Sequence, residues 1–148
     1  SQISEQMGYP IQAIHVPKTI DNDLPLTDNC PGFGSVAKYV AISTREAALD
    51  IESMCATSTK VFILEVMGRH AGWIAGASSL AATERGEAPH IILFPEIAFD
   101  QTKFLSKVSD CVKRFGYCVV VASEGTSTAD GRLLAEMAGC SMRWQAHL

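Results

Sequence analysis

Long apolar runs are missing from this sequence, and no stretch approaches the ~20 residues that cross a bilayer. The stretch from Ser1 to Gln6 is polar apart from Ile3, so we expect no signal peptide. Basic residues are outnumbered, with 12 Lys and Arg against 16 Asp and Glu and a net charge of −4. A broad nucleic-acid surface needs clustered cations. We therefore expect neither a membrane nor a nucleic acid as partner, and an anionic ligand would need a local basic cluster.

The cysteines form no C-x-x-C pair, are odd in number and are widely spaced. They are Cys30, Cys55, Cys111, Cys118 and Cys140. This pattern argues against a disulfide scaffold and against a zinc site. Metal-ligand spacing is also missing among the histidines, which are His15, His70, His90 and His147. Reduced cysteines in a cytoplasmic protein are the simplest interpretation, so we predict a cytoplasmic location.

The residues that are present predict an α/β fold. The 148 residues, 47% of them apolar, fit one globular domain. Apolar runs predict strands at 11–16, 61–66, 90–94 and 117–122, the second of them covered on both faces. Helical spacing predicts the end of a helix at 1–8 and helices at 35–55, 73–83 and 101–115, with a weak helical run at 133–137. Alternating elements of this kind give a three-layer αβα domain with a mostly parallel sheet.

The most informative stretch is Pro17-Lys18-Thr19-Ile20-Asp21-Asn22-Asp23, which follows the first predicted strand. In an extended segment Asp21 and Asp23 would point the same way, and like charges that close make one carboxylate a better proton acceptor near neutral pH. Lys18 and Thr19 could hold an anion beside them. A solvated turn is the alternative interpretation, because turns use the same residue types.

Polar clusters follow each of the predicted strands, at residues 18–23, 67–69, 95–96 and 123–124. Open α/β sheets bind ligands outside the carboxyl ends of their strands. The four clusters together therefore predict a ligand site on that edge. Gly32 and Gly34 precede the first long helix and could either let backbone N–H groups approach a phosphate or simply permit a turn.

Together, Thr-Ile-Asp-Asn-Asp at 19–23, Met-Gly-Arg at 67–69 and Glu124 at a strand end resemble the phosphofructokinase family, most closely its pyrophosphate-dependent branch. The resemblance covers about residues 1–126, in the family's motif order. It implies a phosphofructokinase-like, Rossmann-like fold. It also implies phosphoryl transfer to the 1-hydroxyl of fructose 6-phosphate, with Mg²⁺ as cofactor and pyrophosphate or ATP as donor.

The resemblance also assigns roles to individual residues of the acidic stretch. Asp21 would be the base that takes the hydroxyl proton, about 3 Å from that oxygen. Thr19, Ile20 and Asp23 would help position the sugar and the magnesium-bound donor. The resemblance gives no certain metal ligand, although Asp23 could reach the Mg²⁺ ion through a water. Lys18 would set the donor, since ATP users of the family typically have glycine there and pyrophosphate users have lysine.

Further roles fall on residues later in the chain. Met67, Gly68 and Arg69 would contact the sugar phosphate, and Arg69 would supply positive charge near the transferring group. Glu124 would accept hydrogen bonds from sugar hydroxyls. Lys60 matches a basic position that reaches the 6-phosphate in a neighbouring subunit, so the resemblance also implies a homo-oligomer.

The family's glycine- and aspartate-rich donor loop has no counterpart in this sequence, nor do the later basic residues of its 6-phosphate pocket. We therefore expect residues 1–148 to be one α/β domain, the sugar-phosphate side of a larger two-domain enzyme, with 127–148 as a truncated connector. Phosphoryl transfer depends on positioning, so the piece alone should turn over little or no substrate. An ATP-dependent phosphofructokinase and a non-catalytic sugar-phosphate-binding or regulatory module remain alternatives. A dinucleotide binder is disfavoured, because no G-x-G-x-x-G follows a strand.

Overall fold

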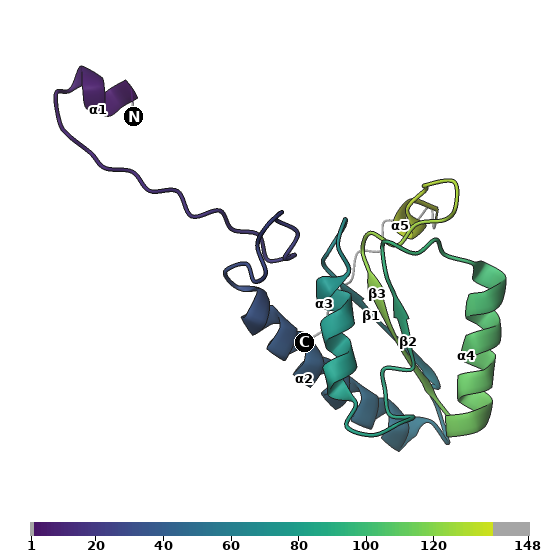
Figure 1. Ribbon diagram of the computed structural model, residues 1–148. Helices are drawn as coiled ribbons and strands as arrows, with labels where there is room; N and C mark the ends of the chain where they lie inside the picture. The colour runs from purple at the N-terminus through teal and green to yellow at the C-terminus, as the bar shows by residue number, and fades with distance from the viewer. Residues whose placement is uncertain (1, 138–148) are drawn as a thin grey trace.

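The computed structural model describes residues 2–137 as a parallel three-stranded sheet flanked by helices (Figure 1). Cys140, His147 and the last part of the predicted 127–148 connector lie outside the described residues. The strands are β1 (Val61–Val66), β2 (Ile91–Leu93) and β3 (Cys118–Ser123), in the order β1-β3-β2. All pairings are parallel, with Val61 beside Cys118 and Ile91 beside Val120.

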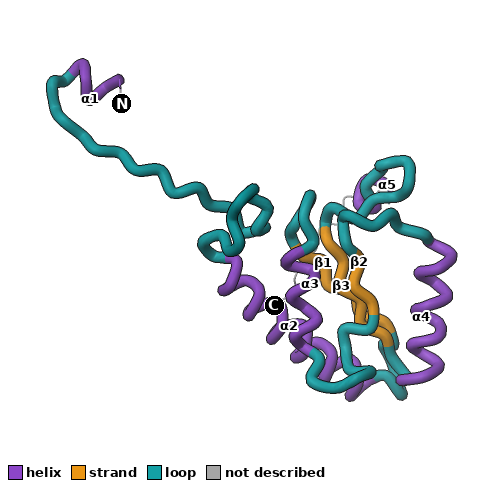
Figure 2. The backbone as a smooth tube through the Cα atoms, in the orientation of Figure 1, coloured by secondary structure: helices purple, strands orange, loops and turns teal. Residues whose placement is uncertain are grey.

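Helices cover both faces of this sheet, as Figure 2 shows. On one face lie α2 (Phe33–Met54), α3 (Trp73–Ala77) and the 3₁₀ helix η1 (Ser78–Ala81). On the other lies α4 (Gln101–Phe115), and the short α5 (Leu134–Met137) follows β3 at the end of the described chain. The predicted three-layer αβα architecture is confirmed.

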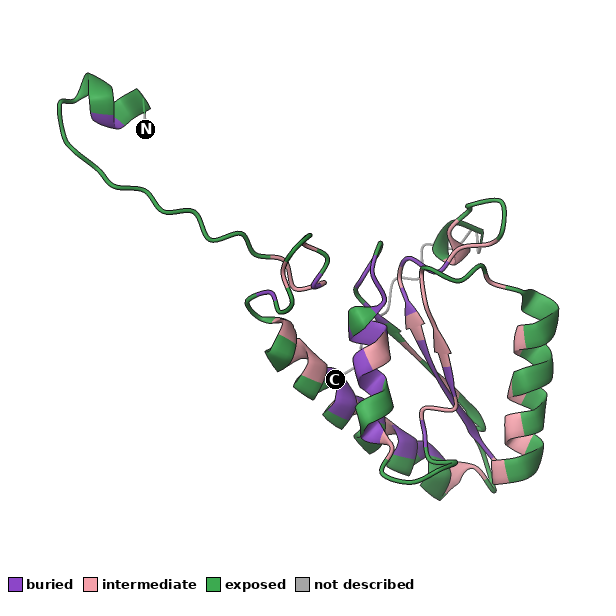
Figure 3. Ribbon diagram, viewed as in Figure 1, coloured by how far each residue is buried: buried purple, intermediate pink, exposed green. Residues whose placement is uncertain are grey.

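The core is centred on β3, whose residues 118–121 are fully buried. Towards α2 and α3, Val121 packs with Val40, Val66 and Ile74. Towards α4, Cys118 and Val120 pack with a second apolar cluster. Figure 3 shows the buried residues gathered between the layers. A nearly continuous apolar run is the pattern expected of a central strand covered on both sides.

The prediction that β1 is covered on both faces is wrong. Its side chains alternate, with Val61 38% and Ile63 50% exposed and Val66 buried. The inward-facing side chains pack mainly against α2 and α3, whereas the cluster under the middle of α4 is built on residues of β2 and β3. An apolar run does not distinguish a central strand from one at the side of the sheet, where β1 lies.

The boundaries of α4 agree with the predicted helix at 101–115. Asp100 caps α4 by accepting a hydrogen bond from Lys103 N at 3.0 Å, and Gly116, with φ of 86°, ends it. The predicted helix at 73–83 is shorter and splits into α3 and η1. The predicted terminal helix at 1–8 is α1 (Gln2–Gln6).

The predicted strand at Ile11–Val16 is wrong. This segment has no strand pairing and extends away from the α/β body, between α1 and the acidic stretch (Figure 1). Ile11 is 55%, Ile14 89% and Val16 68% exposed. A strand needs a neighbour to take its backbone hydrogen bonds, and no strand of the described chain lies alongside. Among residues 2–137, no helix has the length and apolar character needed to cross a bilayer.

His90 links the start of β2 to β3 through its ring as well as its backbone. Its Nδ1 accepts a hydrogen bond from Val119 N at 3.0 Å, while its N–H donates to Val119 O at 2.9 Å. The ring packs against Phe115 and Tyr117 at centroid distances of 5.0 and 5.1 Å, and its Nε2 is buried without a partner among the described residues. Burial lowers the pKa of His90 below its ordinary value of 6.5.

This environment makes stability depend on pH. As pH falls below 6.5, the unfolded chain binds a proton at His90 that the folded chain resists, so the free energy of unfolding should fall, by up to about 1.4 kcal/mol per pH unit. His90→Asn keeps an acceptor for Val119 but does not titrate. Urea unfolding at pH 8, 6.5 and 5 should show the stability gap between the parent and this variant narrowing in acid. A gap that stays constant would contradict the assignment.

Candidate active site at the carboxyl end of the sheet

The three strands are parallel, so the segments that follow them meet at one edge of the sheet. The pairing of β3 with β1 continues one residue past the end of β3, through a hydrogen bond from Glu124 N to Val66 O at 2.9 Å. Ser123, only 3% exposed, donates its hydroxyl to Gly68 O at 2.6 Å and accepts from Gly125 N at 3.2 Å. One buried hydroxyl thus ties the Met67–Arg69 segment to Glu124.

Two glycines make this close approach of backbones possible. A Cβ on Gly125 would lie 1.9 Å from Arg69 O, and one on Gly68 would lie 2.4 Å from Ala71 O. Gly68 also has φ of 120°, a conformation that other residues rarely adopt. The backbone that carries Arg69 is therefore fixed between the ends of β1 and β3.

The segment after β2 joins the same edge through Glu96. Its Oε1 accepts a hydrogen bond from Gly72 N at 2.7 Å, at the start of α3. A Cβ on Gly72 would lie 2.5 Å from Phe94 Cδ1. No ion pair joins Arg69 to Glu65 or Glu96 within residues 2–137, and the Arg69 side chain is exposed.

The acidic stretch is a turn at Ile20-Asp21 rather than an extended segment, but it is not a solvated one. Asn22, with φ of 60° and 6% exposed, donates to Asp28 O at 3.2 Å and accepts from Cys30 N at 2.7 Å. The Thr19 hydroxyl accepts a hydrogen bond from Asp21 N at 3.3 Å. Asn22 therefore closes the following loop and fixes the turn that carries Asp21.

Asp21 is half-buried, and its Oδ1 has no hydrogen-bond partner in the described part of the chain. Burial, and then the charges of Asp23 and Glu124, raise the pKa of Asp21 above its ordinary value. The positive charges of His70 and Lys18 act in the opposite direction. A carboxylate in this setting is a better proton acceptor near neutral pH than an ordinary aspartate.

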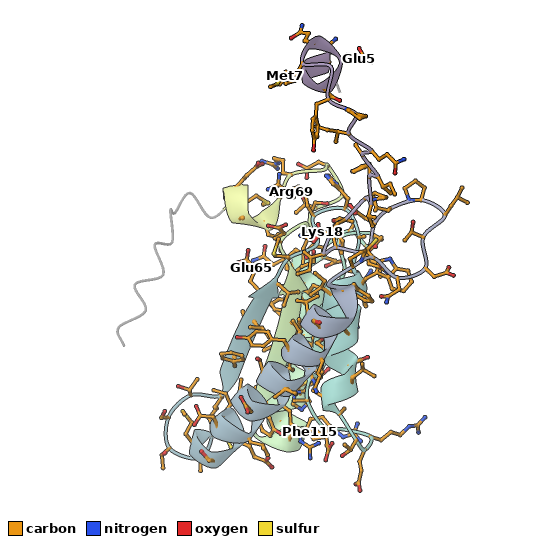
Figure 4. The ribbon with its side chains drawn as sticks, turned by 90° about the vertical axis from the view of Figure 1, so that its left-hand side faces the viewer. Glu5, Met7, Lys18, Glu65, Arg69 and Phe115 are labelled. Atoms are coloured by element: carbon orange, nitrogen blue, oxygen red, sulfur yellow. The ribbon has the colours of Figure 1, made fainter. Side chains whose placement is uncertain are left out.

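The carboxyl end of the sheet therefore brings together residues from three separate segments. Lys18 and Arg69 both lie at the carboxyl end of the body, far from Phe115 (Figure 4). Met67, 55% exposed, and Glu124 line one hollow of about 470 Å³ along β1. Asp23 and His70 line another of about 490 Å³.

Lys60 lies apart from this group. It precedes β1, at the opposite end of the strand, and its Nζ donates to Cys55 O at 2.7 Å. A role for it in this site would require a second subunit. Gly32 has φ of 95° and starts α2 without a side-chain cap, so its place in the turn is explained without a phosphate.

Three residues near the site received no role in the sequence analysis, although Asn22 and Ser123 lie in its predicted polar clusters. Asn22 and Ser123 hold the loops, and His70 opposes the acidic charges around Asp21. An asparagine between two aspartates was a signal for the left-handed turn, because Asn tolerates positive φ. The roles of Ser123 and His70 could not be read locally, since their partners lie far away in the sequence.

Comparisons with known proteins agree with the geometry. A family model described as phosphofructokinase matches residues 1–145. A pyrophosphate–fructose 6-phosphate 1-phosphotransferase of Halomonas elongata is 65% identical over 92% of this chain and 32% of its own length, and one of Methylococcus capsulatus is 63% identical over the same shares. The crystal structure of a pyrophosphate-dependent phosphofructokinase from Marinobacter aquaeolei gives a TM-score of 0.77 at 65% identity, over 93% of this chain and 36% of that one. This chain spans about a third of the length of the curated relatives it matches.

Gly125→Ala should destabilise the chain strongly. The new methyl group would lie 1.9 Å from Arg69 O, so the two loops must separate, at a cost of more than about 2 kcal/mol. Gly34→Ala is the matched control, because its Cβ meets nothing within 4 Å inside α2 and alanine favours helix by about 0.5–1 kcal/mol. Urea unfolding measures both. Equal stability of the two variants would show that the contact is not tight.

His70→Asn should raise the pKa of Asp21 further, since it removes a positive charge that favours the carboxylate. The measurement is a ¹³C carboxyl titration of the aspartate-labelled chain, with Asp21→Asn identifying the resonance. His15→Asn is the control, because His15 is not among the groups that act on Asp21. An identical Asp21 titration in both variants would mean that His70 does not influence it.

Proposed function

Because the chain belongs to the phosphofructokinase family, we propose that it forms part of an enzyme that transfers a phosphoryl group from pyrophosphate to the 1-hydroxyl of fructose 6-phosphate. The product would be fructose 1,6-bisphosphate, and the reaction would be a step of glycolysis. We further propose that the chain forms the sugar-phosphate side of a longer two-domain protein, because it spans about a third of its curated relatives.

The observation that carries this proposal is the position of Asp21. Its carboxylate is half-buried at the ligand-binding edge of the sheet, has an unpartnered buried oxygen and lies near two other acids. A raised pKa suits a group that takes a proton from a sugar hydroxyl as that oxygen attacks phosphorus. Glu124, half-buried beside it, would accept hydrogen bonds from the other hydroxyls of the sugar.

Cationic side chains at the same edge supply the complementary charge. Arg69 extends from a backbone fixed against Gly125, so its guanidinium would stabilise charge on the transferring phosphoryl group. Lys18 is exposed two residues before the turn, where its ammonium adds charge for pyrophosphate and fills space that the α-phosphate of a nucleotide would need.

The remaining predicted contacts fall on the loops. Met67 and Gly68 would touch the sugar phosphate, with Gly68 allowing close approach of backbone. Thr19 and Ile20 would border the sugar as half-buried residues of the turn. Lys60 would act only on the 6-phosphate of a neighbouring subunit, so we propose a homo-oligomer.

Mg²⁺ fits this site as an ion carried on the donor. The described residues offer no cluster of three or more His, Cys, Asp or Glu that could hold a metal by themselves. In phosphoryl transfer Mg²⁺ is usually held by donor phosphates, waters and one or two carboxylates, and the exposed Asp23 can serve as the carboxylate that reaches it through water. When bound, the ion would neutralise charge on the phosphates. The cysteines in the described range are free thiols, which supports the proposed cytoplasmic location.

Asp21→Asn in the longer protein should lower kcat about 10²–10⁴-fold, because the amide cannot take the proton. The KM for fructose 6-phosphate should change little, since the turn is held by Asn22 rather than by the acid. Steady-state kinetics in the forward direction give both values. Ligand binding without turnover, even in the unsubstituted longer protein, would instead support a non-catalytic sugar-phosphate-binding module.

Lys18→Gly should lower kcat/KM for pyrophosphate about 10- to 100-fold, the loss of one charge-assisted contact of about 1.5–3 kcal/mol. The KM for fructose 6-phosphate should stay the same. Lys38→Ala is the control, because it removes the same charge from the exposed side of α2. Unchanged pyrophosphate kinetics, or faster turnover of the unsubstituted protein with ATP, would overturn the donor assignment.

A further inference from the structure

Two cysteine thiols lie together on the face of the sheet that α4 covers. Cys111 is in the last turns of α4, and Cys118 is the first residue of β3. Both lie in one apolar cluster with Val108 and Val120, and the thiol of Cys111 is near enough to raise the pKa of the Cys118 thiol. Both are free cysteines, and the proposed phosphoryl transfer uses neither of them.

The two thiols differ sharply in their surroundings. Cys118 is fully buried, and burial together with the neighbouring thiol raises its pKa to about 12. Cys111 is only partly buried, so part of its side chain is open to a dissolved reagent. The first thiol to meet an external oxidant should therefore be Cys111, while Cys118 is accessible only to its neighbour.

We propose that Cys111 and Cys118 form an oxidation site that a peroxide converts into an intramolecular disulfide. In the first step Cys111 sulfur attacks one oxygen of hydrogen peroxide, the O–O bond breaks, and a sulfenic acid and one water are formed. In the second step Cys118 sulfur attacks Cys111 sulfur, the S–O bond breaks, and the proton of Cys118 leaves with the hydroxyl as a second water. The two thiols lose two electrons, and the peroxide gains them.

The local backbone suits this bond. Only the end of α4, Gly116 and Tyr117 separate the two residues, and Gly116 reverses the chain with its N–H donating to Val112 O at 2.9 Å. The end of α4 and the start of β3 therefore pack together in the cluster that holds both cysteines. Because Cys118 is protonated at neutral pH, the second step should be the slow one, and the sulfenic acid on Cys111 should accumulate before the disulfide. A reducing dithiol would restore both thiols.

The test treats the 148-residue chain with hydrogen peroxide, alkylates the remaining thiols and digests with trypsin. Cleavage after Lys107, Lys113, Arg114 and Arg132 puts the two cysteines on separate peptides, 108–113 and 115–132. We expect mass spectrometry to find these peptides joined, with two hydrogens lost, and to find them separate again after dithiothreitol. Persistence of both as alkylated thiols, while Cys30 or Cys55 is oxidised, would overturn the proposal.

Single variants separate the steps. In Cys118→Ser the sulfenic acid of Cys111 should persist and be trapped by dimedone, with no joined peptides. In Cys111→Ser, which changes a residue on the outer helix, Cys118 should stay reduced at the same peroxide concentration. Oxidation of Cys118 in that variant would contradict the assigned order. Cys55→Ser is the control for a partly buried thiol outside the pair and should leave the joined peptides unchanged. A far-UV circular dichroism spectrum that matches the parent shows that each variant is folded.

Discussion

The contact on which the site depends is the approach of two backbones at the carboxyl edge of the sheet. Gly125 meets Arg69 O where no side chain could fit, and the buried hydroxyl of Ser123 bonds to the neighbouring Gly68. Both strands end there in register, because Val66 pairs with Ser123. The backbone that bears the proposed phosphate-binding arginine is therefore positioned by the sheet itself, which is more rigid than a surface loop.

Several neighbouring charges act on the pKa of Asp21 at this end of the sheet. Asp21 lies where burial and two neighbouring acids disfavour its charge and two bases restore part of it. The net effect raises the pKa of Asp21, which makes its carboxylate a better proton acceptor, as general-base catalysis requires. The same end of the sheet carries the cations Lys18 and Arg69, one from the acidic stretch itself and one from the segment that follows β1.

Sequence alone predicted most of the α/β body, because apolar runs and their Gly or Asp boundaries are local signals, and it predicted the family through the motifs at 19–23 and 67–69. The start of α4 at Asp100 and its end at Gly116 are examples. The errors arose where the answer depends on distant neighbours. Ile11–Val16 has the composition of a strand but no partner among the described residues, and β1 has the composition of a central strand but lies at an edge. The same limit hid the roles of Ser123 and His70, and the roles assigned to individual site residues remain predictions.

The segment that leads into the acidic turn has a practical consequence for handling the protein. Its backbone is unpaired and its isoleucines and valine face solvent. A segment of this kind is accessible to proteases and can pair with the same segment of another molecule. None of residues 2–16 belongs to the apolar clusters of the folded body, so clipping before residue 17 removes no contact of the core. At high protein concentration we therefore expect molecules to aggregate through this segment while the sheet is still folded.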